Sequence, residues 1–324
     1  MRIDGHPLAA LRDQAETTVL IAAAHAAGVF GALDGEGRSA AEVAQRAGLD
    51  PRAVSTVLAA LAETGLLERE GGRYRPTEAC RAGLCDPESE EFVGGGLALW
   101  LHNLGAFARL DEVLRSGGPI APVIGPRDRD GVARLMSAMA AAPADRIRRL
   151  VDGSLRRLRR PRYALDVGAG PGHMSRELAD RGLHVTLFDT PETIDYVRTA
   201  YRLADDDRLT LVGGDFTQGP LPEGPFDLVL LSNVLHIYGP EENRRLVREA
   251  AKVTSPGGVV AIQDFVRGRS GRAARFALVM LLRTEGGDTY ELAELTDWME
   301  SGGLEDVRVE DVDADRQLVT AVRP

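Results

Sequence analysis

The feature that most constrains this chain is a run of alternating glycines within residues 163–175, YALDVGAGPGHMS. The apolar stretch 163–167 predicts a short buried β-strand, and a helix-like segment follows from Met174. The glycines between them allow backbone conformations that other residues avoid, and they let main-chain N–H groups approach a ligand closely. The sequence therefore predicts a strand, a tight turn and a helix N-terminus that together hold a ligand.

The spacing of these glycines separates two kinds of nucleotide-binding turn. The dinucleotide fingerprint has glycines at its first, third and sixth positions, and counted from Gly168 the sixth position is His173, which would keep a pyrophosphate away. The observed pattern, Asp-x-Gly-x-Gly-x-Gly, resembles the first motif of the class I S-adenosylmethionine (SAM) methyltransferases. That resemblance implies SAM as the ligand, and the alternative is a turn that only packs a strand on a helix.

From residue 162 onward, apolar strand-like runs alternate with helical segments. This alternation predicts an α/β fold with a doubly wound parallel sheet. Ligands of such sheets bind beyond the carboxyl ends of the strands, where the strand order switches. The residues expected at these ends are Gly168, Asp189, Asp215, His236 and Asp264.

Two of these strand-end carboxylates fit the parts of a nucleoside. Asp189 offers acceptors on both oxygens, which suits a ribose diol. Asp215 could accept from the adenine amino group while the neighbouring Phe216 stacks on the base. Each aspartate taken alone is also a common turn residue, so the prediction rests on their joint recurrence.

The first third of the chain has the pattern of a winged helix. An Ala-rich helix is expected over residues 8–31, Ser39 and Glu42 form a capping box, Asp50 caps a third helix, and residues 66–76 read as a hairpin. The helix 8–31 carries apolar residues on most sides, so we expect it to be buried in a core or against a partner.

A winged helix can bind DNA, but this one is poorly suited to it. The expected reading helix, residues 51–64, offers only Arg52, Ser55 and Thr56 toward bases, and glutamates alternate with the arginines of the wing. The formal net charge of −10 also disfavours a nucleic-acid surface over the whole chain. Dimerisation is the favoured role of this module.

Composition indicates a cytoplasmic protein. The 324 residues are 44% hydrophobic, yet no apolar run approaches the ~20 residues of a membrane helix, and the N-terminus lacks the features of a signal peptide. Cys80 and Cys85 suit neither a metal site nor a disulfide framework, so free thiols and no bound metal are expected.

Taken together, the winged module, DVGAGPG, GDF, SNVLHIYGPEEN, SPGG and TEGGDTY resemble the cation-independent O-methyltransferases. These include plant caffeic-acid-type enzymes and bacterial enzymes that tailor antibiotics and pigments. The resemblance implies a class I Rossmann-like sheet, with an N-terminal α-helical winged-helix dimerisation domain, in a homodimer that methylates a hydroxyl of a small aromatic molecule. The implied division is a dimerisation domain at 1–90, connecting helices at 91–150 and a SAM-binding catalytic domain at 151–324.

The same resemblance assigns roles to individual residues. His236 stands at the position of the catalytic base, and Asp264 at that of an acidic residue that orients it, usually a Glu. A second Glu of many plant members is replaced by Thr289. The implied SAM contacts are Gly168, Asp189, Asp215, Phe216 and Ser232.

Residues 270–301 are expected to form a lid over the acceptor. By resemblance Met139 and Met280 line the acceptor pocket, together with Phe276 and Thr284 of the lid, and Trp100 and Asn103 are possible additions. Core packing is the alternative for each of these side chains.

The chemistry itself stays open at this point. Members of this fold also methylate N or C, and a few use bound SAM for hydroxylation, decarboxylation or ring closure. A methyl transfer would release S-adenosylhomocysteine (SAH), and a reaction that leaves SAM unconsumed would not.

Overall fold

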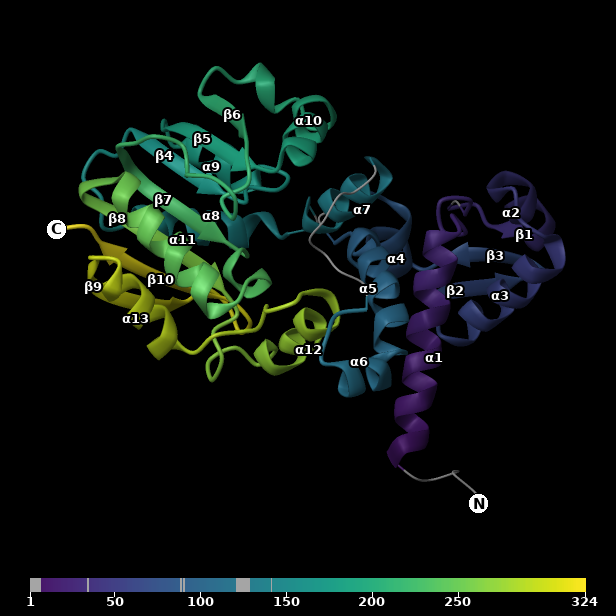
Figure 1. The fold of residues 1–324 in the computed structure, drawn as a ribbon. Coiled ribbons are helices and arrows are strands. Elements are labelled where there is room, and N and C mark those ends of the chain that lie inside the picture. Colours follow the sequence, from purple (N-terminus) through teal and green to yellow (C-terminus); the bar gives the residue numbers. More distant parts are fainter. Residues whose placement is uncertain (1–6, 34, 88, 90, 121–128, 141) are drawn as a thin grey trace. The chain divides into compact units, whose positions relative to one another are not determined.

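The computed structural model describes residues 7–324 except 34, 88, 90, 121–128 and 141. It divides the chain into two compact units, Met1–Gly105 and Ala106–Pro324 (Figure 1). The predicted division into three parts, with boundaries near residues 90 and 150, stays a proposal.

The N-terminal unit contains a small antiparallel sheet and the expected helices. Its elements are α1 (Pro7–Ala26), β1 (Arg38–Ser39), α2 (Ala40–Ala47), α3 (Pro51–Glu63), β2 (Leu67–Glu70), β3 (Arg73–Pro76), α4 (Glu78–Cys80), the π-helix η1 (Arg81–Cys85) and α5 (Gly94–Phe107). The strands pair in the order β1-β3-β2. The capping box is confirmed: the Glu42 carboxylate accepts from the Ser39 N–H at 2.7 Å, and the Ser39 hydroxyl oxygen accepts from the Glu42 N–H at 3.3 Å.

Helix α1 is shorter than predicted, and its first half is exposed within this unit. It ends at Ala26, and Gly28 adopts a left-handed conformation (φ 79°) that turns the chain away from the helix axis. Ala22 and Ala24 are buried, whereas Leu11 in the first half of the helix is 59% exposed. This unit alone therefore does not bury the whole helix, and its burial against a partner stays a prediction.

The second unit is organised around a seven-stranded sheet of order β6-β5-β4-β7-β8-β10-β9. Its strands are β4 (Tyr163–Val167), β5 (His184–Asp189), β6 (Leu209–Gly213), β7 (Phe226–Ser232), β8 (Thr254–Asp264), β9 (Glu305–Asp311) and β10 (Gln317–Val322). The first five pair in parallel, while β10 is antiparallel to both β8 and β9. The predicted doubly wound sheet is confirmed, and its strand order switches between β4 and β7.

Helices cover both faces of this sheet (Figure 1). The helical elements are α6 (Leu110–Ser116), α7 (Arg129–Ala140), α8 (Ala144–Leu155), α9 (His173–Asp180), α10 (Pro191–Ala200), the 3-10 turns η2 (Leu203–Asp205) and η3 (Leu235–Ile237), α11 (Pro240–Val253), α12 (Ala273–Arg283) and α13 (Leu292–Ser301). Helices α8, α9 and α10 pack on one face, with α7 joining that core, and α11 and α13 pack on the other.

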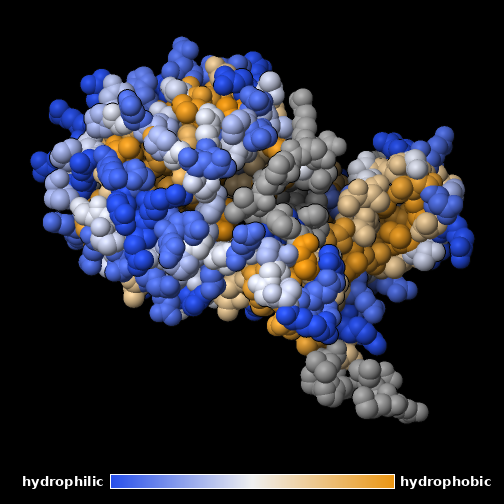
Figure 2. Space-filling model, viewed as in Figure 1, coloured by the Kyte–Doolittle hydropathy of each residue, from blue (hydrophilic) through white to orange (hydrophobic). Residues whose placement is uncertain are grey.

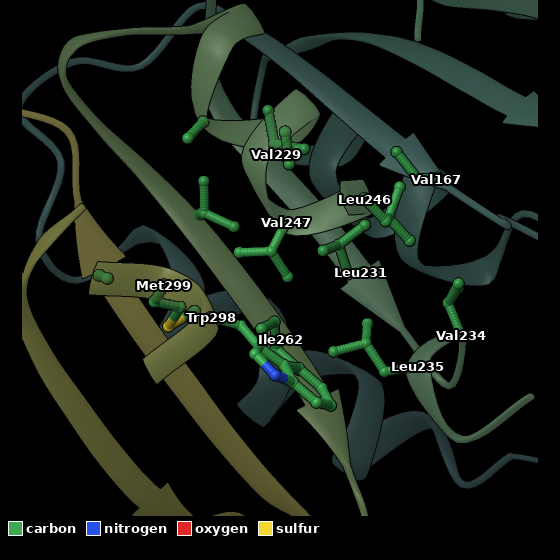
Figure 3. Close-up of a cluster of buried hydrophobic side chains, with 14 of the residues drawn as sticks. Val167, Val229, Leu231, Val234, Leu235, Leu246, Val247, Ile262, Trp298 and Met299 are labelled. Atoms are coloured by element: carbon green, nitrogen blue, oxygen red, sulfur yellow. The ribbon is translucent and has the colours of Figure 1, made fainter. Parts of the chain in front are cut away.

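The core beneath α11 and α13 holds the strands that lead to the candidate site. Figure 3 shows Trp298 and Met299 of α13 close to Ile262 of β8, with Val247 of α11 packed above Leu231 of β7. Side chains of this size each contribute about 1.5–3 kcal/mol when fully buried. This packing fixes the ends of β7 and β8, from which the candidate catalytic residues follow.

Within the part of the chain that the structure describes, no helix has both the length and the apolar character needed to span a membrane.

Candidate functional site

The glycine turn between β4 and α9 has the strained backbone that only glycine adopts readily. Gly168, Gly170 and Gly172 have φ values of 67°, 52° and 76°. A Cβ atom on Gly168 would lie 2.6 Å from a methyl group of Val234, so the turn also packs too closely for a side chain. A Cβ atom on Gly170 would lie 2.8 Å from the terminal carbon of Met139, which places that predicted pocket residue against the turn.

The Asp189 carboxylate meets this turn at the end of β5. One of its oxygens accepts from the Gly170 N–H at 2.8 Å, and the other accepts from the Thr190 N–H at 2.7 Å. Main-chain donors therefore fix the direction of both oxygens. This geometry fits the predicted contact with a ribose diol, which stays a prediction.

A second carboxylate on this half of the site is completely enclosed. Asp166 of β4 is 1% exposed, and its carboxylate accepts from the Ser175 hydroxyl at 2.7 Å. Burial raises the pKa of Asp166 to about 7, and the nearby charge of Asp189 acts in the same direction. Asp166 was part of the sequence motif, but neither its raised pKa nor its partner Ser175 was predicted.

The two residues predicted to contact adenine, Asp215 and Phe216, have different neighbours in the structure. Asp215 caps its own turn, because its carboxylate accepts from the N–H and hydroxyl of Thr217 at 2.8 and 2.6 Å and from the Gln218 amide at 2.9 Å. Phe216 lies half-buried against Tyr238, with ring centroids 4.9 Å apart and an interplanar angle of 68°. Both adenine contacts stay predictions.

Ser232, the last predicted SAM contact, belongs to an amide cluster at the ends of β7 and β8. The Gln263 side-chain oxygen accepts from the Ser232 hydroxyl at 2.7 Å and from the Asn233 amide at 2.8 Å. Asn233 has a φ of 57°, and its N–H donates to the Gln263 carbonyl at 2.9 Å. Gln263 thus holds the turn that leads to His236, a role that no sequence pattern indicated.

His236 and Asp264 form a buried pair at the centre of the site. They are 7% and 5% exposed, and the His236 Nδ1 lies 2.7 Å from the Asp264 Oδ1. Main-chain N–H groups of Phe265 and His236 also donate to this carboxylate, at 2.8 and 3.3 Å. The structure therefore brings together the two residues that the family resemblance assigned to catalysis.

Helix α12 supplies an aromatic neighbour to this pair. The Phe276 ring meets the His236 ring at 4.8 Å and 89°, and it stacks on Phe265 at 4.1 Å and 28°. Phe265 carries no motif signal and was not predicted as a site residue.

In the predicted lid, hydrogen bonds to main-chain groups hold the end of α12 and the turn that follows it. Met280 is buried, and its carbonyl accepts from the Thr284 hydroxyl at 2.8 Å, while the Thr284 hydroxyl accepts from the Gly287 N–H at 2.9 Å. A Cβ atom on Gly287 would collide with the His236 carbonyl. The turn after α12 therefore packs directly on the segment that carries His236.

Two further pocket predictions lie in the N-terminal unit. Trp100 and Asn103 are on α5, where Trp100 is 36% exposed. Their role in acceptor binding stays a prediction. Among the described residues, no three or more His, Cys, Asp or Glu side chains are grouped to hold a metal ion.

Comparison with known families agrees with this architecture. Residues 165–262 match the family of methyltransferase domains, and residues 15–85 match the O-methyltransferase dimerisation domain.

Two bacterial relatives align over most of their length. The tetracenomycin polyketide synthesis 8-O-methyl transferase TcmO of Streptomyces glaucescens is 30% identical over 310 residues, which cover 91% of this chain and 90% of the relative. The 3-hydroxy-5-methyl-1-naphthoate 3-O-methyltransferase of Streptomyces sahachiroi is 30% identical over 308 residues, with 90% and 87% covered.

Solved structures share the fold at lower identity. Human N-acetylserotonin methyltransferase in complex with SAM superimposes with a TM-score of 0.85 at 20% identity, covering 100% of this chain and 99% of that one. NcsB1 from neocarzinostatin biosynthesis, in complex with SAM and 2-hydroxy-5-methyl naphthoic acid, gives a TM-score of 0.74 at 24% identity, with 95% and 96% covered. The chain belongs to the small-molecule O-methyltransferase family and is a SAM-dependent methyltransferase.

Proposed function

We propose that this enzyme transfers the methyl group of SAM to a hydroxyl of a small aromatic natural product, with His236 as general base. The observation that carries the proposal is the buried hydrogen bond of 2.7 Å between the His236 Nδ1 and the Asp264 Oδ1, just beyond the ends of β7 and β8. The bacterial relatives support the substrate class, since their names specify O-methylation of an aromatic polyketide and of a hydroxynaphthoate.

The hydrogen bond to Asp264 assigns the tautomer of the base. If Nδ1 carries the proton that it donates to the carboxylate, the lone pair of the neutral ring lies on Nε2. Bound SAM supplies a methyl group already activated by its sulfonium. As the acceptor oxygen bonds to the methyl carbon, its proton moves to the His236 Nε2, the carbon–sulfur bond breaks with its electrons left on sulfur, and SAH remains. Asp264 stabilises the imidazolium that forms.

The acceptor is expected to be flat and apolar because of what surrounds the base. Phe276 presents its ring to His236, and the flexible thioether Met139 lies at the glycine turn. Such side chains suit an aromatic ring that must lie between the base and the methyl group. In this proposal Met280, Thr284, Trp100 and Asn103 complete the pocket.

Substitution of the base tests the chemistry. With hydroxynaphthoates and aromatic polyketides as acceptors, His236→Gln should lower kcat by about 10²-fold or more, because a general base typically contributes that much. Affinity for SAH, measured by calorimetry, should stay near that of the wild type. Asp264→Asn should lower kcat less, since it orients the base without accepting the substrate proton.

Product stoichiometry separates this proposal from its rivals. Wild-type enzyme should form SAH and methylated product in equal amounts, with the new methyl on oxygen by NMR. Conversion of an acceptor while SAM is not consumed would establish a non-methylating reaction, and a methyl found on nitrogen or carbon would overturn the hydroxyl assignment. Full activity of His236→Gln would remove the base from its proposed role.

We also propose that the N-terminal unit forms a homodimer. The match to the dimerisation domain over residues 15–85 supports it, as does the exposure of Leu11 on α1. Figure 2 shows that the visible surface of this unit is largely apolar. Removal of residues 1–30 should give monomers or aggregates in light-scattering chromatography, and a stable, active monomer would contradict the proposal.

The same unit is not expected to bind DNA. Two of its wing arginines pair with carboxylates, with Arg75 at 3.2 Å from Glu68 and Arg73 at 3.2 Å from Glu42. A salt-sensitive mobility shift with duplex DNA would show otherwise.

In this proposal residues 1–90 dimerise, 91–150 connect and line the acceptor pocket, and 151–324 catalyse. The two free cysteines fit a reducing cytoplasm, where we expect the reaction to occur.

A further inference from the structure

A cation lies on the far side of the aromatic pair that contacts the base. The Arg316 guanidinium carbon is 3.3 Å from the centroid of the Phe265 ring. The other face of Phe265 stacks on Phe276 at 4.1 Å, and the edge-to-face contact with His236 follows at 4.8 Å. Since the guanidinium and Phe276 are both too close to Phe265 to share one face, they lie on opposite faces of that ring. The His236 ring lies beside both phenylalanines, with its centroid 4.8 Å from that of Phe276 and 6.4 Å from that of Phe265.

The two aspartates nearest to Arg316 in the sequence form their ion pairs with other arginines. Arg316 lies in the turn between β9 and β10, where Asp313 pairs with Arg146 at 2.6 Å and Asp315 approaches Arg272 at 3.9 Å. Burial lowers the pKa of Arg316 to about 10, against the opposing effect of the Asp264 carboxylate. The guanidinium therefore keeps its charge at neutral pH in a mostly enclosed position.

Asp264 links this cation to the base. The N–H of Phe265, whose ring carries the guanidinium, donates to the Asp264 Oδ1 at 2.8 Å, and the same oxygen holds the His236 Nδ1. No second carboxylate stands where many plant members have one, because Thr289 occupies that position. Thr289 is buried and directs its hydroxyl to the Ala273 carbonyl at 3.4 Å.

We propose that Arg316 is a positioning residue that acts through Phe265 and Asp264 to keep His236 in its neutral, proton-accepting form. A nearby positive charge disfavours the imidazolium and favours the ionised carboxylate. This inference rests on the proposed role of His236.

Several other groups bear on the same pair. Arg272 precedes α12, Arg146 projects from α8 and is balanced by Asp313, and the Tyr290 phenol donates to the Tyr238 carbonyl. Burial raises the pKa of Tyr290, so that phenol is neutral at the pH of interest. Arg316 differs from Arg272 and Arg146 in its direct contact with the Phe265 ring.

The test compares the pH dependence of kcat in three variants. Arg316→Met removes the charge, so the rising limb of the profile should move to higher pH by about 0.5–1 unit. Arg316→Lys keeps the charge and should stay closer to wild type. Arg269→Met is the matched control, because Arg269 pairs with Asp311 on the exposed surface. NMR titration of the His236 ring in the SAH complex should show the same shifts without requiring turnover.

The outcomes separate this inference from the proposed function. If the wild-type limb exists and disappears in His236→Gln but is unmoved in Arg316→Met, Arg316 does not tune the base. A fall in kcat at every pH without a shift would assign Arg316 a structural role only and would overturn the inference. If His236→Gln is fully active, the proposed base itself fails, whatever Arg316 does.

Discussion

At the ends of β4 and β5, where the cofactor is proposed to bind, main-chain atoms position the side chains, whereas at the ends of β7 and β8 other side chains do so. We call the first of these regions the cofactor half. The Asp189 oxygens are aimed by the N–H groups of Gly170 and Thr190. Across the switch point, Asp264 holds an imidazole and Gln263 holds a hydroxyl. A site built from backbone is intolerant of added side chains, while one built from side chains depends on segments far away in the sequence.

The largest effect is expected from adding a side chain to the glycine turn. Gly168→Val should lower the free energy of unfolding by about 2–5 kcal/mol, the sum of a left-handed backbone and an overpacked contact with Val234. SAH binding should be lost in calorimetry. Gly182→Ala is the control, because Gly182 also has a positive φ (90°) but has open space around it. That variant should cost about 1–2 kcal/mol and bind SAH normally.

The second prediction concerns how the free energy of unfolding depends on pH through the buried carboxylate of Asp166. Asp264 has three donors, whereas Asp166 has the Ser175 hydroxyl and a pKa raised to about 7. Because the folded pKa of Asp166 lies above its ordinary value, the folded state binds more protons between about pH 4 and pH 7, and stability falls as pH rises through that window.

Asp166→Asn should remove this dependence. The unfolding free energy of wild type, relative to that of the variant, should decrease by up to about 4 kcal/mol between pH 4 and pH 8. Urea unfolding at several pH values measures it. Parallel curves for the two proteins would mean that Asp166 is not held protonated.

A smaller effect should separate binding from chemistry. Asp189→Ala should weaken SAH binding by about 1–3 kcal/mol, since the donors at the turn lose their acceptor and the ribose loses its own. At saturating SAM, kcat should fall far less than in His236→Gln. Glu192→Ala, an exposed acidic residue in the first turn of α10, is the control and should leave both quantities unchanged. If the Asp189 variant bound SAH with normal affinity but had a reduced kcat, the proposed separation of cofactor binding from catalysis between the two halves would be wrong.

The cofactor half could be predicted from sequence because its determinants are local. The turn can be identified from the sequence without any knowledge of packing. It is marked by three glycines within five residues, by the apolar strand before them and by an aspartate at the end of the next strand. The pairing of His236 with Asp264 was predicted from the family resemblance, and the structure places Asp264 at the end of β8 and His236 just after β7. Arg316 over Phe265 could not be predicted, because the contact joins a surface turn to a strand end and no periodicity marks it. Asp215, whose carboxylate turns to Thr217, shows that a strand-end position does not decide what a side chain binds.

The two ends of the segment that carries α12 lie side by side. The Arg267 N–H donates to the Tyr290 carbonyl at 2.8 Å, and Arg267 forms a parallel bridge with Glu291. Since the two ends already lie side by side, a replacement of different length between them adds little loop-closure entropy and leaves the sheet register untouched. An exchange of residues 268–290 for a segment of another length should therefore leave the sheet intact, provided that it keeps Gly287 against the His236 carbonyl and the buried contact of Leu282 with Val113.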